Sequence, residues 1–209
     1  MSRERTARPP ADVDDRSKSA RTRERILHAA AEVLSRKGYA GTRLADVADV
    51  AGVQAPAIYY YWSSRDALIE EVVTVGQQAT LEHVVARLDA LPDGSAAMDR
   101  ILCAVAAHLE VVLSRSDFAL AAIRNGGQLP ADIRERQLVG QRAYADVWRA
   151  LIDRAVADDA LAPVDRRAAR MLVLGALNWA PEWWDPRRSP LDTVIATAQH
   201  LVRRGLAQG

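Results

Sequence analysis

Apolar residues recur at helical spacing along almost the whole chain. The first such pattern predicts a helix from Ser19 that Gly38 ends. Its apolar positions are Ile26, Ala30, Val33 and Leu34. No segment shows the sustained alternation that is typical of strands, and short apolar runs such as 111–113 lie inside windows of helix length. The pattern therefore predicts an all-α protein.

Two short helices and a long one are expected next. Thr42 is a good N-cap for a helix that Gly52 ends, and Pro56 is tolerated in the first turn of another helix over 54–62. Ser63 or Ser64 then caps a fourth, longer helix that reaches Leu88. Further helices are expected at 96–114, 117–125, 131–158, 166–183 and 190–204, separated by Gly, Pro or Asp clusters.

The chain divides into three parts on these patterns. Residues 1–19 lack periodicity and contain Pro9-Pro10, which predicts a disordered arm. Residues 20–65 form a small helical module, and 66–209 form a larger one. Of the 209 residues, 16–65 carry nine Lys or Arg against four Asp or Glu, a net charge of +5, whereas 66–209 carry sixteen against nineteen. The small module is therefore basic and suits a polyanionic partner.

Composition argues against a secreted protein, a membrane protein and an enzyme with a recognisable catalytic motif. The single Cys103 excludes an internal disulfide, no signal peptide is visible, and the apolar stretch 171–180 is too short to span a bilayer. We therefore expect a cytoplasmic protein without membrane contact. The four histidines show no metal-ligand spacing, and no phosphate loop or nucleophile motif occurs. No catalytic site, metal or cofactor is predicted, although distant residues could still assemble a catalytic site.

Two short helices joined by a turn at Gly52 have the spacing of a helix-turn-helix. Gln can read adenine edges, Ala can touch a thymine methyl group, and tyrosine hydroxyls bind phosphates. Arg43 and Arg65 stand at helix starts, where they could grip phosphates or remain solvated charges; the tyrosines could instead pack inward. The candidate DNA contacts are Thr42, Arg43, Gln54, Ala55, Ala57, Tyr59, Tyr60, Tyr61 and Arg65.

These residues carry a resemblance to a known family. The elements Gly38-Tyr39-x-Gly41-Thr42, Val47-Ala48-x3-Gly52-Val53 and Ile58-Tyr59-Tyr60-Tyr61-Trp62 strongly resemble the N-terminal domain of the TetR/AcrR repressors. The resemblance implies that the remaining helices form a divergent regulatory domain that dimerises and holds a small-molecule pocket. Gln54 stands where the family usually has Ser or Thr, and Ala55 where Lys or Arg is common, so the resemblance implies no particular operator sequence.

The last two predicted helices suggest a dimer interface. The segment 171–177 is apolar on every side, and the next helix bears one apolar stripe. A two-fold four-helix contact would bury both, with Gly175 permitting close approach, whereas the alternative is a core within one chain. The candidate interface residues are Leu174, Gly175, Leu177, Leu191, Val194, Ile195, Ala198, Leu201 and Val202.

Between those helices, 178–186 contains three tryptophans. It is similar to a segment of TetR-like regulators of fatty-acid and steroid catabolism, whose ligands are often acyl-CoA thioesters, although Pro181 departs from that pattern. The alternative is an aromatic plug that ends the helix. The candidate ligand contacts are His108, Arg124, Trp148, Asn178, Trp179 and Trp183. A histidine such as His108 is also common as a hydrogen-bonded core residue.

Together these features predict a repressor that binds double-stranded, pseudo-palindromic DNA as a homodimer and is released by a small amphipathic effector, with an acyl-CoA as one candidate. The alternative is a DNA-bound factor that docks a protein instead of a metabolite. A roomy apolar cavity would favour the repressor, and a filled core with an exposed apolar patch would favour the alternative.

Overall fold

The computed structural model describes residues 11–207, and these residues are almost wholly helical, as predicted. The only extended pairing among them is a single bridge between Leu161 and Ala207. The helices are α1 (Ala11–Gly41), α2 (Leu44–Ala51), α3 (Ala55–Ile58), α4 (Arg65–Asp89), α5 (Ala97–Glu110), α6 (Asp117–Asn125), α7 (Ala131–Ala157), α8 (Arg166–Trp183) and α9 (Leu191–Leu206). No helix within 11–207 combines the length and apolarity that a membrane crossing requires.

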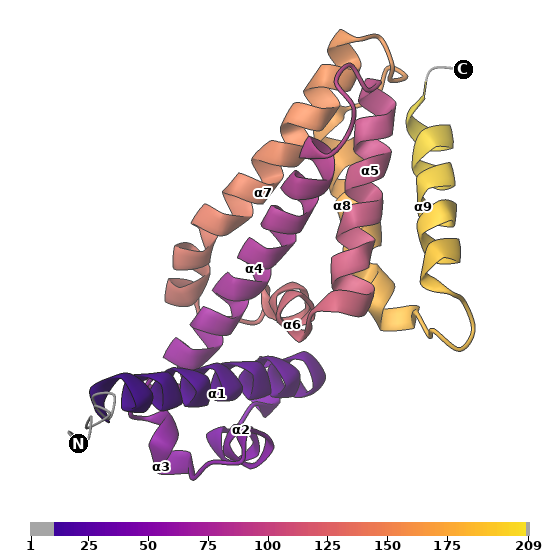
Figure 1. Cartoon of the computed structure of the whole chain (residues 1–209). Helices are drawn as coiled ribbons and strands as arrows, with labels where there is room; N and C mark the ends of the chain where they lie inside the picture. The colour runs from indigo at the N-terminus through magenta and orange to yellow at the C-terminus, as the bar shows by residue number, and fades with distance from the viewer. Residues whose placement is uncertain (1–10, 208–209) are drawn as a thin grey trace, which may run out of the picture.

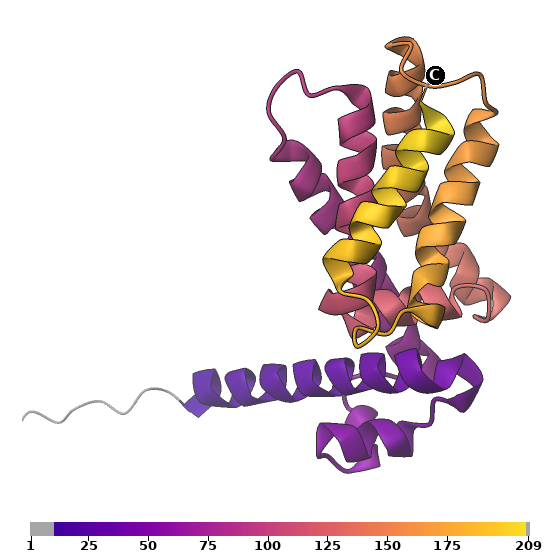
Figure 2. The same ribbon diagram turned by 90° about the vertical axis from the view of Figure 1, so that its right-hand side faces the viewer.

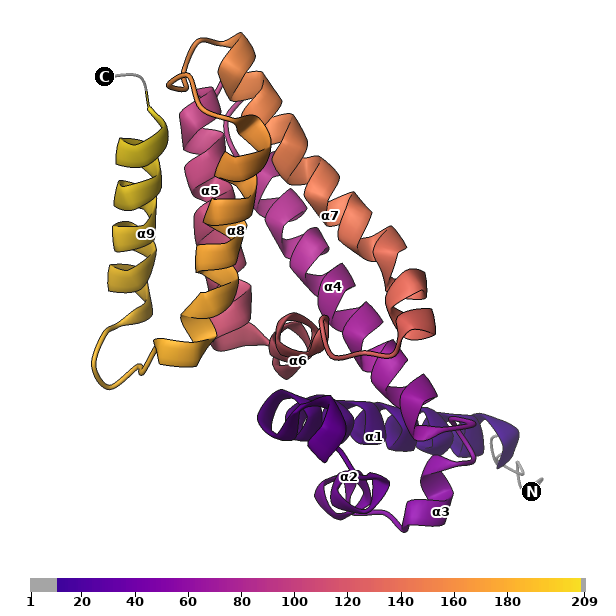
Figure 3. The ribbon, with the colours of Figure 1, turned by 180° about the vertical axis from the view of Figure 1, so that it is seen from behind.

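The helices form two stacked units. In Figure 1, α1 runs crosswise beneath an upright bundle of α4 to α9, and α2 and α3 lie on the side of α1 that faces away from the bundle. The view from behind shows the same arrangement, with α4 rising obliquely out of the lower unit (Figure 3). We call α1, α2, α3 and the turn to α4 the head. The outer layer of the head is therefore free of contact with the bundle.

The first helix is longer than predicted. It begins at Ala11 and not at Ser19, so 11–19 are helical, and residues 1–10 of the expected arm lie outside the described residues. Adding residues to an existing helix costs little, which explains how the helix extends beyond its apolar face. Gly38 interrupts α1 with a positive φ of 70°, as its position in the pattern predicted.

The helix-turn-helix differs from the prediction at two ends. Gly52 closes α2 in the left-handed region, as expected, but the N-cap of α2 is Arg43 and not Thr42. The next helix ends at Ile58, because the backbone N–H of Tyr61 bonds the Ile58 carbonyl (3.0 Å) in a tight turn that redirects the chain. Ser64 then caps α4 by accepting a bond from the Ala67 N–H at 3.0 Å.

Two apolar cores meet along α4. The head core includes Val72 of α4 and reaches Phe118 and Ala122 of α6, whereas the bundle core includes Val84 and Trp148. Between them, Gly76 lies so close to α6 that an added Cβ would overlap the Phe118 carbonyl oxygen. The long fourth helix therefore contributes to the cores of both units.

The later helices match the predicted ranges with one exception. Both α6 and α8 have the predicted bounds, but the helix expected over 96–114 changes character at its end. There, α5 stops at Glu110 and a π-helical turn, Val111–Arg115, takes over. Such a wider turn lets one helix end reorient before the next begins. The chain thereby turns from the upright α5 into the transverse α6 (Figure 1).

Candidate nucleic-acid interface and ligand cavity

Polar and aromatic side chains cover the outer layer of the head. Gln54 is the exposed N-cap of α3, and Arg43 is exposed at the start of α2. Tyr59 and Tyr60 are 60% and 80% exposed in the turn after α3, while Ile58 beside them is buried. Gln54, Tyr59 and Tyr60 therefore point away from the core of the head. Ala55 and Ala57, also candidate DNA contacts, are half-buried on the same short helix.

Two other candidate DNA contacts point into the head. Thr42, predicted as a DNA contact, is 1% exposed and donates its hydroxyl to the Gly38 carbonyl (2.7 Å), so its side chain does not lie on the outer face of the head. Its small β-branched side chain fills the bend after Gly38, which a spacing argument alone could not reveal. Tyr61 is half-buried, and its hydroxyl lies 3.2 Å from Ser19 Oγ.

Arg65 braces the head through contacts within it, and its role as a phosphate contact stays a prediction. Its guanidinium lies 4.4 Å from the centre of the Tyr39 ring and donates to Asp66 at 2.9 Å. The Tyr39 hydroxyl donates to the same carboxylate at 3.0 Å, and burial followed by that hydrogen bond raises the pKa of Tyr39. These contacts join the end of α1 to the start of α4.

A second brace, which local spacing does not predict, joins α4 to α1. Glu71 of α4 accepts bonds from Arg23 of α1 (2.6 Å) and from the indole N–H of Trp62 (2.7 Å). The Arg23 guanidinium also lies 4.8 Å from the Trp62 ring centre. Arg23 and Glu71 are 48 residues apart, so no local spacing predicts their pairing. The one visible signal was an aromatic residue, Trp62, just before an expected helix start.

The bundle contains a cavity of about 250 Å³. It lies among α4, α5, α6, α7 and α8, and of the described residues that line it, none is Asp, Glu, Lys or Arg. Small and aliphatic residues form most of the wall. Its polar lining residues are Gln77, Thr80, His108, Gln141, Tyr144 and Asn178. Two of these, His108 and Asn178, were predicted, and the others were missed because only folding brings them together.

His108 is the most deeply placed polar group of the cavity. It is 1% exposed, its Nδ1 lies 2.7 Å from the Tyr144 hydroxyl, and the two rings stack. Its Nε2 has no hydrogen-bond partner in the part of the chain that the structure describes. Burial lowers the pKa of His108 to about 4, with a smaller opposing effect from Asn178, so the ring is neutral at pH 7.

The other ligand candidates lie outside this cavity. Trp148 is buried behind it, with its ring edge toward Tyr144. Arg124 and Trp179 line an open cleft of about 760 Å³ between α1 and α8. Arg124 donates there to Glu182 (2.6 Å) and to the Ser35 carbonyl (2.9 Å). Trp183 borders an apolar groove between α8 and α9.

The predicted dimer residues differ in how far they are exposed on the surface of the chain. Figure 2 shows α8 and α9 side by side on one face of the bundle. Leu177 and Val194 are buried inside the chain, which corrects their assignment to a dimer surface. Leu174, Leu191, Ile195, Ala198 and Val202 are half-buried, whereas Gly175 and Leu201 are exposed. The exposed apolar residues of α8 are Ala168, Met171, Leu172, Ala176, Trp179 and Trp183.

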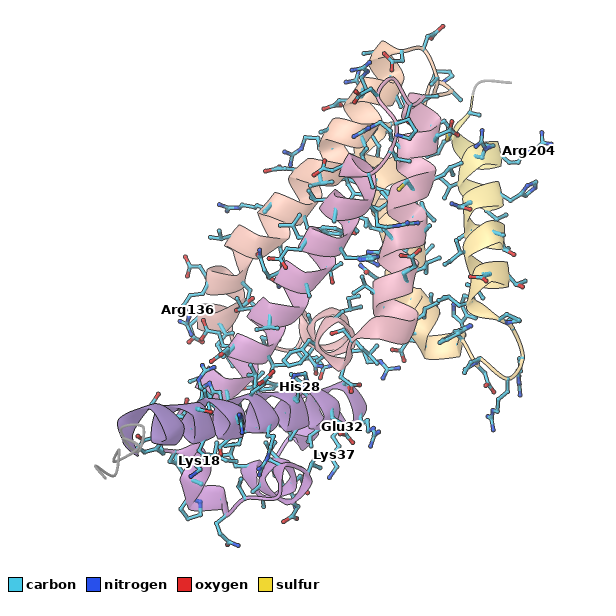
Figure 4. All side chains as sticks on the ribbon, in the orientation of Figure 1. Lys18, His28, Glu32, Lys37, Arg136 and Arg204 are labelled. Carbon is cyan, nitrogen blue, oxygen red and sulfur yellow. The ribbon has the colours of Figure 1, made fainter. Side chains whose placement is uncertain are left out.

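Further contacts tie the head to the bundle. His28 of α1 meets Phe118 of α6 edge to face, with ring centres 4.9 Å apart (Figure 4). Arg136, near the start of α7, pairs with Glu70 of α4 at 2.6 Å (Figure 4). Together with the bonds of Arg124, these contacts connect α6, α7 and α8 of the bundle to α1 and α4.

Comparison with known proteins identifies both units. Residues 26–72 match the family described as bacterial regulatory proteins, tetR family, and 94–206 match the tetracyclin repressor-like C-terminal domain. The HTH-type transcriptional repressor KstR2 of Rhodococcus jostii is 23% identical over 95% of this chain and 97% of its own length.

Solved structures agree on the fold. The TetR family regulator PfmR of Thermus thermophilus has a TM-score of 0.74 at 22% identity, covering 88% of this chain and 100% of PfmR. AibR, solved in complex with isovaleryl coenzyme A and operator DNA, has a TM-score of 0.78 at 19% identity, covering 88% of this chain and 97% of AibR. The chain therefore belongs to the TetR family of DNA-binding bacterial transcriptional regulators.

Proposed function

We propose that this regulator is a repressor that binds a pseudo-palindromic operator as a homodimer and is released by a small amphipathic molecule. One observation carries the proposal: α4 begins at the head with Arg65 and lines the cavity with Gly76, Gln77 and Thr80. A ligand that fills the cavity thus contacts the helix on which the head is mounted. By linkage, it must bind the DNA-incompetent arrangement more tightly than the competent one.

The outer layer of the head supports operator binding. Gln54 and Tyr60 are exposed on α3 and the turn that follows it, and a helix this short contacts few base pairs. Two heads related by a two-fold axis would add their energies. The exposed apolar face of α8 and α9 suits contact with a second copy, because a patch of this kind is otherwise unfavourable in water.

Two neighbouring spaces support an amphipathic ligand such as an acyl-CoA. The cavity of about 250 Å³ can take a short acyl group but not a nucleotide. The open cleft shares Ile123 and Asn178 with it and is bordered by Arg36, Lys37 and Arg124. Those cations pair with Glu32, Asp46 and Glu182, pairs that an anionic head group would compete with. The AibR complex is a precedent for a coenzyme A thioester in this fold.

A DNA-bound factor that docks another protein is the second candidate, and the exposed tryptophans of α8 favour it. A second copy of the chain accounts for the same face. The cavity favours the ligand-controlled repressor, because a protein-docking factor has no need of an internal space.

The experiment combines operator mapping with release. Footprinting on DNA selected from random sequence should show two half-sites with two-fold symmetry, and affinity should fall steeply with salt because the head is basic. Gln54→Ala should alter base preference more than overall affinity. Titration of short-chain acyl-CoAs into the complex should release the DNA. An operator without two-fold symmetry, or no release by any acyl-CoA, would contradict the respective half of the proposal.

A further inference from the structure

The polar groups of the cavity specify which kind of ligand it accepts. No cation lines it among the described residues, and the deepest polar side chain, His108, leaves one ring nitrogen without a partner. A buried carboxylate needs a cation or several donors, whereas an uncharged polar group needs only one or two hydrogen bonds. The lining therefore disfavours a free acid at this depth.

The hydrogen bond between Tyr144 and His108 bears on which ring nitrogen of His108 carries the proton. The phenol hydroxyl lies 2.7 Å from Nδ1, and we assign it as the donor, which places the proton of the neutral ring on Nε2. Burial keeps Tyr144 protonated, because it raises the pKa of the phenol, with a smaller opposing effect from the Trp148 indole. The Nε2 N–H of His108 has no hydrogen-bond partner within 3.5 Å among the described residues, and Asn178 is the neighbouring side chain whose hydrogen-bonding effect raises the pKa of the ring against the larger effect of burial.

We infer that the cavity binds the uncharged carbonyl end of a short acyl compound, with the carbonyl oxygen accepting a hydrogen bond from His108 Nε2 near the amide of Asn178. The inference rests on the proposed ligand control and names its ligand class. An amide, a ketone and a thioester share this chemistry. The cavity volume of about 250 Å³ suits a short or branched acyl chain.

The test compares matched small molecules on the full chain at pH 7.5. For one branched acyl chain of about five carbons, the primary amide, the methyl ketone, the N-acetylcysteamine thioester, the carboxylate and the parent hydrocarbon are titrated. Saturation-transfer NMR and thermal shift both follow binding. We expect the three carbonyl compounds to bind at least about tenfold more tightly than the carboxylate or the hydrocarbon.

Variants locate the binding group. His108→Phe should abolish the preference for the carbonyl compounds, and Asn178→Leu, at the exposed rim, should weaken it. His200→Phe makes the same change at an exposed position of α9 and should leave binding unchanged. If His108→Phe fails to fold, Asn178→Leu carries the test, because Asn178 is exposed and contributes little to the core.

Three outcomes would overturn the inference: a carboxylate that binds as tightly as the amide, a His108→Phe variant that keeps the preference, or no binding by any compound. Operator binding is measured in parallel by anisotropy. Failure to bind DNA would overturn the proposed repressor while leaving the cavity measurements valid, so the two failures are distinguishable.

Discussion

The exposed tyrosines of the head differ from the buried side chains in what they contact. Tyr60 is 80% exposed, and its ring meets the Tyr61 ring edge to face at 4.9 Å between centres. We expect Tyr60→Ala to raise the dissociation constant for operator DNA about three- to tenfold, the value of one lost phosphate hydrogen bond, with little change in unfolding free energy. Fluorescence anisotropy with a labelled duplex measures the first and urea unfolding the second.

Two further variants make that result specific. Tyr60→Phe should reproduce most of the loss if the hydroxyl binds phosphate. Thr42→Ala removes a buried hydrogen bond and should lower stability by about 1 kcal/mol, while affecting DNA binding less than Tyr60→Ala does. Parental DNA affinity in Tyr60→Ala would show that the exposed tyrosine is not a DNA contact.

His108 gives the stability of the protein a pH dependence of its own. Its pKa is about 4 when folded and near its ordinary value of 6.5 when unfolded. As pH falls from 6.5 to 4, the unfolded chain takes up a proton that the folded chain does not, so this residue destabilises the fold by up to about 3 kcal/mol. Above pH 6.5 the effect is absent.

His108→Gln should therefore show a shallower loss of stability than the parent in that range. Urea unfolding at about pH 7.5, 5.5 and 4.5 measures it, and His200→Gln, an exposed change, should keep the parental slope. Parallel curves for His108→Gln and the parent would mean that the histidine ionises freely in the folded protein.

At the scale of elements, the contact between α4 and α6 depends on one glycine. An added Cβ at Gly76 would overlap the Phe118 carbonyl oxygen, and backbone cannot move aside as a flexible side chain can. We expect Gly76→Ala to cost about 1–3 kcal/mol by overpacking, despite the better helix propensity of alanine. Thermal unfolding should show a lower Tm.

Gly205→Ala is the matched control, because a Cβ at this helical position of α9 meets nothing within 4 Å. Its Tm should stay level or rise slightly. A Tm for Gly76→Ala equal to that of Gly205→Ala would mean that α4 and α6 are free to separate, and the close contact would then not couple head and cavity.

Helix positions were predictable where capping residues or glycine mark the helix ends. Ser116 and the Asn125-Gly126 step bound α6, and Asp165 caps α8, so both ranges follow from local chemistry. The orientation of α8 was not predictable, because a segment that is apolar on every side has no preferred inner face. Leu177 accordingly turned out to be buried, and Trp179 to be 65% exposed.

The residues of the candidate site also divide into those that local spacing predicts and those that only folding brings together. Outward and inward positions around Ile58 follow from helical spacing within one short element. The cavity needs five helices to converge, so Tyr144 and Gln77 gave no local signal, and Arg124 drew attention as a possible anion partner although it joins α6 to α1 and α8. Tertiary contacts of this kind are set by packing, which a single sequence does not encode locally.

At the scale of the whole molecule, the α8 face is joined to the head. Arg124 donates to the Pro181 carbonyl and Glu182 at the end of α8 and to the Ser35 carbonyl of α1. In the proposed dimer, a shift at the cavity would therefore change the separation of the two heads while the α8 contact stays in place. Operator half-sites at a set spacing would detect such a change.

The proposed dimer predicts the effect of a charge on this face. Leu172 on α8 and Val139 on α7 are both 74% exposed, so a charge at either position costs little in a monomer. In a two-fold dimer through α8, Leu172→Glu would bury two like charges at the interface, and we expect the dimer dissociation constant to rise at least about a hundredfold. Val139→Glu should remain dimeric.

Sedimentation equilibrium measures the dimer dissociation constant of both variants. Operator affinity should fall when the dimer dissociates, because one head alone reads too few base pairs. A Leu172→Glu protein that stays dimeric would place the interface elsewhere, and the exposed tryptophans of α8 would then favour a different protein as the partner for this face.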